Sequence, residues 1–367
     1  MDILVAIKDE DKEAIRDLYV NSFSDSVQFV DYYFKEKFIS SRVMAIKEDT
    51  RITSMLHLNP FEVRFNGEKY HVSYIVAVAT AIEYRKKGYM GRLMQAALNR
   101  LFESGEVFSL LMPIDSRIYE RYGYGFIEDH LRFECDSATF MVKPTKYDYT
   151  VADDKDMSKL ADIFEEFTKQ FNLSTIRNSA SFEMLYKELL TDNGKILIFK
   201  DGYVMSYYED EILHIRELVS NTDNTFNEII SYIKEVTHLG KVVIMDHSRS
   251  PIKYITPNIS QNIIKLQPFM MARIINVEAF MKANIKLFVN DIKIKVTDDF
   301  IVDNNHIFHI HNDTVSKNVD LEFDVEVDIK LLTQLAFGYM KATEIQSLKK
   351  KDFMNDILNN NFFNEYV

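Results

Sequence analysis

The chain has 367 residues, 47% of them hydrophobic and 13% aromatic, and this length favours two or three domains. Its 44 basic and 56 acidic residues give a net charge of −12, which argues against a nucleic-acid-binding protein. A single cysteine, Cys135, excludes an intramolecular disulfide, and no apolar run is long enough to span a membrane. The acidic residues Asp2, Asp9, Glu10 and Asp11 break any N-terminal signal sequence, so we expect a cytoplasmic protein.

The first part of the chain predicts an alternation of strands and helices. The apolar spacing predicts a strand at 3–7, helices at 9–23 and 25–38, and strands at 42–48, 52–65 and 68–80. Asn66-Gly67 is typical of a hairpin turn between the last two strands. The second helix carries the aromatic residues Phe29, Tyr32, Tyr33 and Phe34, which we interpret as core, although some could also wall a pocket.

The most informative stretch joins the strand at 73–82 to a helix that begins near residue 90. The connection reads Arg85-Lys86-Lys87-Gly88-Tyr89-Met90-Gly91, a basic turn with two glycines. A helix start exposes unpaired N–H groups and a partial positive charge, and glycine lets the backbone approach a phosphate. The turn therefore predicts an anion site, with an exposed basic connection as the plainer alternative.

This segment resembles motif A of the GNAT acetyltransferases, in which an [R/Q]-x-x-G-x-[G/A] turn holds the pyrophosphate of acetyl-CoA. Arg85 and Gly88 match, whereas Met90 stands where the motif has Gly or Ala and Gly91 follows one place later. With this departure the turn resembles that of the Eis (enhanced intracellular survival) branch of the family, in which larger residues follow the first glycine. The resemblance implies that the pyrophosphate is bound by the turn residues Arg85, Lys86, Lys87, Gly88, Tyr89, Met90 and Gly91. It also implies that the pantetheine arm and the thioester carbonyl are held by the backbone of Val78, Ala79 and Thr80.

A second motif follows a predicted buried strand at 107–112. Residues 113–126 predict a short helix that ends at Gly123, and they resemble the family pattern I-Y-x-R-[F/Y]-G-Y-G. Within it Tyr119 falls on the family's general acid, a phenol that would protonate the departing thiolate. We interpret Tyr122 and Tyr124 as packing residues. No Ser-His-Asp or Cys-His arrangement is apparent and Cys135 reads as structural, which favours direct transfer over an acyl-enzyme.

The pattern restarts after a predicted linker at 143–146. A strand from 149, helices at 153–171 and 179–190, strands at 195–200, 202–209 and 211–219, a helix at 225–238 and a strand at 241–246 repeat the order of the first domain. The turn at 220–224 has neither cations nor glycines, so this second GNAT-like domain should not bind CoA.

The last part predicts antiparallel strands at 287–296, 299–302, 306–311 and 319–327 and helices at 328–339 and 353–358. These resemble the sterol-carrier-protein-like domain that closes Eis proteins. His306, His309 and His311 could suggest a metal, but only Asp303 and Asp313 flank them, so we interpret a solvated strand and expect no metal.

The tail carries three aromatic residues among its last six, which are costly to leave in water. We therefore expect it to dock on the protein. The resemblance to Eis proteins implies that the C-terminal carboxylate, here that of Val367, accepts the proton of the acceptor amine.

The sequence thus predicts an α/β (α+β) chain of two tandem GNAT-like domains, each a mixed sheet flanked by helices, and a sterol-carrier-like α+β domain, with boundaries at 1–142, 143–282 and 283–367. The resemblance implies an acetyl-CoA-dependent N-acetyltransferase that acts on an aminoglycoside, a polyamine or a lysine amine. It also implies a homo-oligomer, a trimer or hexamer, with no nucleic-acid or membrane partner. The alternatives are a non-catalytic CoA- or ligand-binding protein and a transferase of a longer acyl group.

Overall fold

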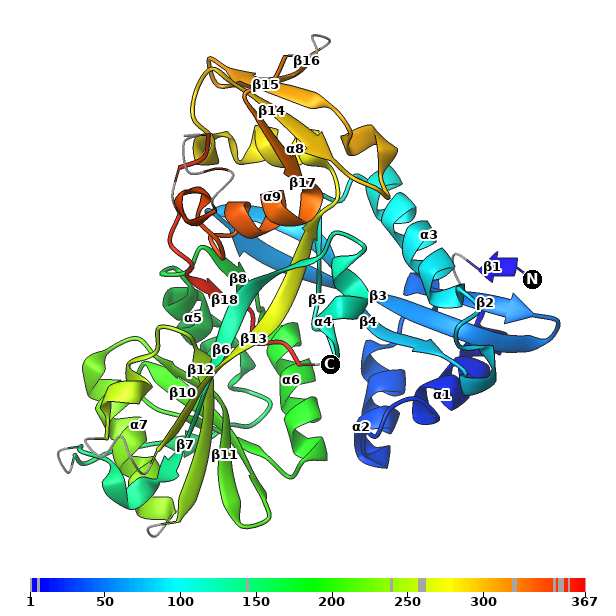
Figure 1. Ribbon diagram of the computed structural model, residues 1–367. Coiled ribbons are helices and arrows are strands. Elements are labelled where there is room, and N and C mark those ends of the chain that lie inside the picture. Colours follow the sequence, from blue (N-terminus) through cyan, green and yellow to red (C-terminus); the bar gives the residue numbers. More distant parts are fainter. Residues whose placement is uncertain are drawn as a thin grey trace.

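The computed structural model describes residues 2–4, 7–142, 145–237, 240–256, 262–318, 322–345, 348, 353–355 and 357–366. Figure 1 shows an N-terminal lobe in blue and cyan, a second lobe in green, and a smaller orange domain packed over their junction. None of the helices in this described part combines the length and the apolar character that a membrane crossing needs.

The N-terminal lobe is a sheet with helices on both faces. Its elements are β1 (Asp2–Leu4), α1 (Lys12–Val20), α2 (Val27–Tyr32), β2 (Val43–Glu48), β3 (Arg51–Phe65), β4 (Glu68–Thr80), α3 (Tyr89–Glu103), β5 (Phe108–Leu111), α4 (Ser116–Glu120) and β6 (Gly125–Asp136). Strand β2 is buried on both sides because Met44 and Ile46 pack with α3, while Val43 and Ala45 pack with α1 and α2. The predicted hairpin turn after β3 is confirmed, since Asn66 and Gly67 both have positive φ.

The second lobe repeats this order, as predicted. Its elements are β7 (Thr150–Val151), α5 (Met157–Thr168), β8 (Leu173–Thr175), α6 (Ser179–Thr191), β9 (Lys195–Ile198), β10 (Gly202–Glu209), β11 (Ile212–Ser220), α7 (Asp223–Val236) and β12 (Lys241–His247). Strand β8 was not predicted. It has three residues, too few for a periodic signal, and it pairs with β3 of the N-terminal lobe. Lys143 and Pro144 of the predicted linker lie outside the described residues.

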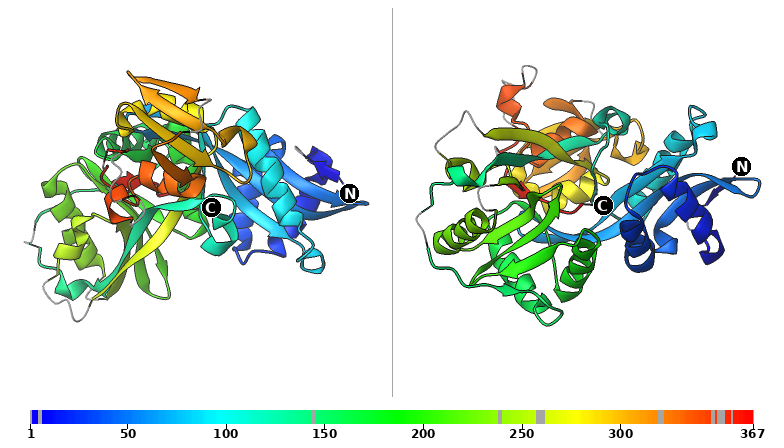
Figure 2. Two further views of the ribbon diagram at one scale, coloured as in Figure 1. Left: turned by 45° about the horizontal axis from the view of Figure 1, so that its top comes forward. Right: turned by 90° about the horizontal axis from the view of Figure 1, so that it is seen from below.

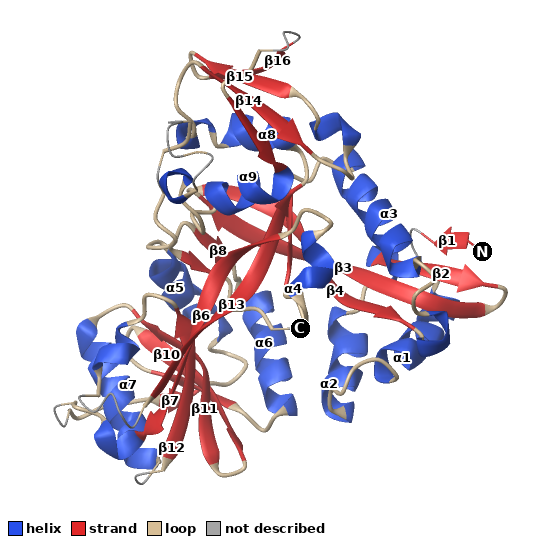
Figure 3. Cartoon of the chain, in the orientation of Figure 1, coloured by secondary structure: helices blue, strands red, loops and turns tan. Residues whose placement is uncertain are grey.

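Strand β13 (Ile263–Ile274) completes the sheet of the N-terminal lobe, which continues into the second lobe through the pairing of β6 with β12. The main strand order is β1-β2-β3-β4-β5-β13-β6-β12-β11-β10-β9-β7, so β13 lies between β5 and β6 and is antiparallel to both. Residues of the predicted second domain therefore complete the sheet of the first. Figure 3 shows the strands of the two lobes meeting along β6 and β13.

The C-terminal domain has its own four-stranded sheet, in the order β16-β15-β14-β17. Its elements are α8 (Val277–Ala283), β14 (Ile292–Thr297), β15 (Ile307–His311), β16 (Thr314–Asn318), β17 (Val325–Asp328) and α9 (Ile329–Ala336). The expectation that these strands are all antiparallel is wrong, because β17 runs parallel to β14.

Two predicted elements of this domain are absent from its described residues. The predicted strand at 299–302 is a loop, because the Asp298 carboxylate accepts the N–H groups of Phe300 and Ile301 at 2.9 and 3.1 Å. The predicted helix at 353–358 is also missing, and Met354 instead forms a β-bridge with Phe288. The tail forms a short strand, β18 (Asn361–Phe362), and runs between the two lobes (Figure 2).

Candidate active site

The two central strands of the N-terminal lobe part in the middle of the sheet. Parallel strands β4 and β5 pair only at Tyr74–Leu110 and Ile75–Leu111, and β4 then continues for five residues beyond the end of β5. The ladder to β3 is irregular at the same level, where Ala77 adopts a φ of +52°. A bulge of this kind bends the strand and redirects its backbone groups. The parting strands leave backbone of β4 available to an extended ligand.

The three predicted β4 residues follow this bulge. Val78 and Thr80 are half-buried and Ala79 is buried, whereas the residues in the middle of the strand are all buried. The Thr80 hydroxyl bonds Ser54 Oγ at 2.8 Å, and its carbonyl accepts from Arg85 Nε at 3.1 Å. The strand end is therefore tied to the basic turn that follows it.

The predicted phosphate turn leads into α3. Gly88 is the N-cap with a φ of +80° and makes no side-chain cap, so the first-turn N–H groups of α3 are not satisfied by a capping side chain. Lys86 also has a positive φ, of 63°, and Arg85, Lys86 and Lys87 are exposed. A 15-residue helix directs its positive end at this turn, beside three cations.

Gly91 has a steric reason to be glycine. A Cβ built on it would lie 3.3 Å from the Tyr122 hydroxyl oxygen, closer than most real Cβ contacts. Gly88 and Gly91 border a groove of about 610 Å³, with Arg92 and Gln95 of α3 on one side and Arg121 and Tyr122 on another. Phe300 of the C-terminal domain also lines the groove, and its ring lies 5.0 Å from that of Tyr122. Sequence reasoning did not identify Phe300, which comes from another domain.

Tyr119 lies on α4, where the Asp115 side chain caps the helix by accepting from Arg117 N. The ring is buried in the cluster that contains Ile75 and Leu111, the last residues that pair before β4 and β5 part. Burial, with a smaller contribution from Tyr122, raises the pKa of Tyr119 to about 12. The phenol therefore carries its proton at neutral pH and can act as a donor. Tyr122 and Tyr124 are buried packing residues, as predicted.

The tail docks between the lobes, as predicted from its aromatic residues. Strand β18 pairs with β8, and the rings of Phe362 and Phe363 are buried, which is worth roughly 1.5–3 kcal/mol for each side chain. Both carboxylate oxygens of buried Glu128 accept the Phe363 N–H, at 2.9 and 3.2 Å. The Tyr366 hydroxyl forms a hydrogen bond with His130 Nδ1 at 3.2 Å. Val367 lies outside the described residues.

A buried charge network holds the tail, and sequence reasoning missed it. Arg177 of the second lobe donates to Glu365 Oε1 at 2.7 Å, to the Asn364 carbonyl at 3.2 Å and to Glu217 at 2.7 Å. Burial alone would lower the pKa of Arg177, but Glu217 and Glu365 hold it well above its ordinary value. The tail is thereby fixed by paired charges that cannot be separated cheaply.

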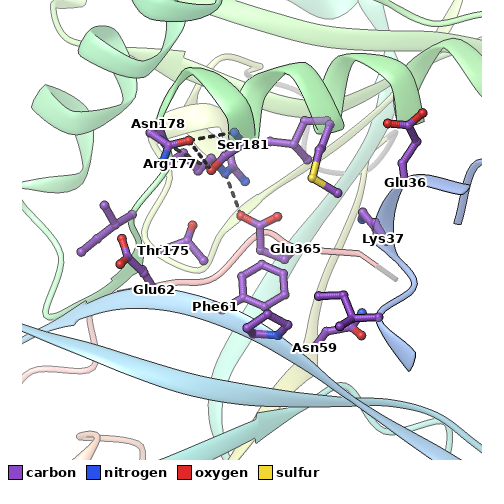
Figure 4. Close-up of a pocket in the computed structure, with 15 residues that line it drawn as sticks. Glu36, Lys37, Asn59, Phe61, Glu62, Thr175, Arg177, Asn178, Ser181 and Glu365 are labelled. Carbon is purple, nitrogen blue, oxygen red and sulfur yellow. Dashed lines mark hydrogen bonds and ion pairs between the residues drawn. The ribbon is translucent and has the colours of Figure 1, made fainter. Parts of the chain in front are cut away.

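A cavity of about 320 Å³ lies beside this tail, between the lobes (Figure 4). Side chains from four parts of the chain line it: Glu36 and Lys37 after α2, Asn59, Phe61 and Glu62 on β3, Thr175, Arg177, Ser181 and Met184 in the second lobe, and Glu365 in the tail. Phe29, Tyr32, Tyr33 and Phe34 are absent from this lining. Tyr33 and Phe34 are buried core residues with Phe29 packed against them, as predicted, and the hydroxyl of buried Tyr32 donates to the Met184 carbonyl of α6 at 2.7 Å.

The lining of this cavity has more carboxylates than cations. Its three carboxylates belong to Glu36, Glu62 and Glu365 and its two cations to Lys37 and Arg177, and Arg177 is paired with Glu365 within the lining. Lys37 is paired with buried Glu188, and Arg177 with Glu217. Hydrogen bonding to Lys187 lowers the pKa of Glu36, so that group is ionised at neutral pH. A cavity with this balance favours a positively charged ligand.

Two family models match the chain. An acetyltransferase (GNAT) domain matches residues 5–127, and a sterol carrier protein domain matches residues 277–359. A search of curated proteins gives no match.

Solved structures share the fold over nearly the whole chain. A probable N-acyltransferase from Enterococcus faecalis has a TM-score of 0.83 at 19% identity, covering 97% of this chain and 94% of that one. A GCN5-related N-acetyltransferase from Anabaena variabilis has a TM-score of 0.84 at 17% identity, with 100% of both chains covered. Eis1 from Mycobacterium abscessus has a TM-score of 0.77 at 14% identity, covering 99% of this chain and 100% of that one.

Proposed function

We propose that this chain, which carries a GNAT acetyltransferase domain and a C-terminal sterol carrier protein domain, is an Eis-like enzyme that transfers the acetyl group of acetyl-CoA directly to an amine. The observation that carries this proposal is that Tyr119, the basic turn and the C-terminal tail all lie near the point where β4 and β5 separate. Tyr119 belongs to the same buried cluster as the last paired residues, the basic turn follows the free end of β4, and the tail is hydrogen-bonded to Tyr74 at the same level.

In the proposed reaction the neutral amine nitrogen attacks the thioester carbonyl carbon, and backbone N–H groups of Val78 to Thr80 polarise that carbonyl. The carbon–sulfur bond breaks, and the departing thiolate takes the phenolic proton of Tyr119. The extra proton on the acylated nitrogen passes to the α-carboxylate of Val367. The turn from Arg85 to Gly91 binds the pyrophosphate, so it contributes to donor affinity and not to the chemical step.

We propose that the acceptor is a cation with more than one amine. The carboxylates of Glu36, Glu62 and Glu365 surround the cavity, and the tail that bears the proposed base forms part of its wall. A polyamine or an aminoglycoside fits this charge, and a lysine side chain in a peptide is the third acceptor to test. Neutral amines should be poor acceptors because they gain nothing from the carboxylates.

The test is release of free thiol from acetyl-CoA by the purified protein without a C-terminal tag. Amine-dependent release, highest with polycations, is the expected result. A protein that binds acetyl-CoA but releases no thiol with polyamines, aminoglycosides or lysine peptides would instead support the non-catalytic alternative. Longer acyl-CoA donors in the same assay test the alternative that the protein transfers a longer acyl group, because a deep thioester pocket would accept them.

The role of the Val367 carboxylate has its own test. Extension of the chain beyond Val367 converts the carboxylate to an amide and should abolish turnover while acetyl-CoA binding persists. Full activity of the extended protein would remove the carboxylate from the mechanism. We further propose a cytoplasmic homo-oligomer, a trimer or hexamer, which light scattering on the purified protein can measure.

A further inference from the structure

Three polar side chains converge at one end of the C-terminal sheet, away from the active site. His309 and His311 lie two residues apart on β15 and so share one face of the strand. Asp291, in the turn before β14, places Oδ1 3.1 Å from His309 Nε2 and 3.2 Å from His311 Nδ1. The three donor atoms all lie within 4.8 Å of one another. One carboxylate oxygen thus faces two imidazole nitrogens.

These separations fit the coordination sphere of a small transition-metal ion. Imidazole nitrogen and carboxylate oxygen bind Zn²⁺ at about 2.0–2.2 Å, and two ligands of a tetrahedral ion are then roughly 3.3 Å apart. The two distances from Asp291 Oδ1 are close to that value. The plainer interpretation is that Asp291 only accepts hydrogen bonds from the two rings, and it predicts no affinity for metal.

The surroundings support the metal interpretation. The second nitrogen of His311, Nε2, lies 2.8 Å from the side-chain amide of Asn312, so a rotated amide would accept its proton while Nδ1 binds metal. The Asn312 N–H donates to Asn290 Oδ1 at 2.8 Å, which fixes the two turns against each other. A recess next to the cluster is lined by the carboxylates of Glu322 and Asp324 and by one cation, Lys293. Carboxylates therefore outnumber cations around the proposed site.

We propose that Asp291, His309 and His311 form a binding site for a divalent transition metal, with Zn²⁺ as the probe of choice. Two imidazoles and a carboxylate are ligands that suit Zn²⁺, Ni²⁺ and Cu²⁺, and they leave one position for water. Bound metal would join the turn before β14 to the end of β15 and stabilise the domain. The site is independent of acetyl transfer.

The experiment uses full-length protein without a histidine tag, freed of metal by a chelator. Zinc titrated by calorimetry should bind with a stoichiometry of one, and zinc should raise the melting temperature of the protein. His309→Ala and Asp291→Asn should each weaken zinc binding by at least about tenfold and abolish the thermal shift. The matched control is His306→Ala, a histidine of the same sheet region that packs on Phe308 and is outside the cluster.

Loss of zinc binding in the two ligand variants with retention in His306→Ala would establish the site. If no zinc binds at concentrations up to about 100 μM, any affinity would be too weak for a specific site, and the proposal would be overturned. Zinc binding that survives in both ligand variants would also overturn it, because the ion would then bind elsewhere. Circular dichroism of each metal-free variant confirms that it is folded.

Discussion

The hydroxyl of Tyr74 donates to the carbonyl oxygen of Glu365 at 3.2 Å, across 291 positions of sequence. Tyr74 is on β4, paired with Leu110 of β5 one residue before the two strands part. One buried hydrogen bond therefore joins β4, the strand that we propose binds acetyl-CoA, to the C-terminal tail. Tyr74→Phe should retain the fold but release the tail, and we expect kcat to fall about tenfold, since an unmade buried bond costs about 1–3 kcal/mol.

The matched control for this prediction is Tyr70→Phe. Tyr70 is a buried tyrosine of the same strand whose hydroxyl accepts from Asn284 Nδ2 at 3.0 Å and does not touch the tail. Steady-state kinetics should separate the two variants, with loss of kcat only for Tyr74→Phe. Equal kinetics in both variants would mean that the bond to Glu365 does not position the tail.

Tyr119→Phe removes the proposed acid. We expect kcat to fall about 10²–10⁴-fold while the Kd of acetyl-CoA stays unchanged, because the phenol acts only on the departing thiolate. Tyr124→Phe is the control, since its hydroxyl bonds buried Ser109 Oγ at 2.6 Å and should affect stability more than turnover. Comparable losses of kcat and donor affinity in Tyr119→Phe would contradict the acid role.

The pH dependence of turnover follows from the same residue. Because the pKa of Tyr119 is about 12, its protonated form persists through the neutral and mildly alkaline range. Activity should therefore rise with pH as the acceptor amine loses its proton, without an opposing loss from Tyr119 below about pH 11. A rate profile of kcat from pH 6 to 10 checks this, and an alkaline decline that is absent in Tyr119→Phe would refute it.

Arg177→Met leaves two buried carboxylates without their counter-charge. We expect a loss of about 3–5 kcal/mol in the free energy of unfolding at neutral pH. Arg64→Met is the control, because Arg64 pairs at 2.6 Å with Glu165, whose side chain is 45% exposed, and such a pair is worth about 0–1 kcal/mol. Urea denaturation of both variants measures the difference.

The sign of the pH effect distinguishes this network from simple packing. Burial alone would raise the pKa of Glu217, but Arg177 holds it below its ordinary value of 4.5. A lowered folded-state pKa contributes stability above the ordinary value that is lost as pH falls through the lowered one. The natural protein should thus lose stability below about pH 4.5. Without Arg177 the pKa of Glu217 should rise, so the variant should gain stability on acidification from neutral pH to about pH 5.

Gly88→Ala and Gly67→Ala form a matched pair. Both glycines have positive φ, 80° and 88°, and a Cβ on either would meet no atom within 4 Å. Each substitution should cost about 1 kcal/mol of stability through backbone strain alone. Only Gly88→Ala should weaken acetyl-CoA binding, because only Gly88 begins the helix that we propose binds the phosphates. Calorimetric titration with acetyl-CoA measures this, and equal affinities would place the pyrophosphate elsewhere.

Local patterns in the sequence predicted most of the fold, and they supply the candidate residues for the donor half of the proposed site. The run from Ser73 to Ala81 has a β-branched, apolar composition, and the helix after it repeats at 3.6 residues, so both elements were predicted within a few positions. The docking of the tail was also predicted, because buried aromatic area is visible in composition. These features depend on neighbours in sequence.

The parts that were missed depend on contacts between distant residues. Arg177 meets Glu365 across 188 positions, and nothing near either residue indicates the other. Asp291 lies next to His309 because β14 and β15 are paired, whereas the nearby acids that sequence reasoning considered, Asp303 and Asp313, are outside the cluster. Register and domain packing, which set such contacts, have no local signature.

The position of β13 has a consequence for synthesis of the protein. The chain leaves the ribosome from its N-terminus, so β5 and β6 emerge long before the strand that lies between them. Until residue 274 has emerged, the N-terminal lobe keeps two open strand edges that invite pairing with other nascent chains. We therefore expect a fragment that stops at residue 142 to aggregate. The lobe that is translated first therefore completes its sheet only after the second lobe has been translated.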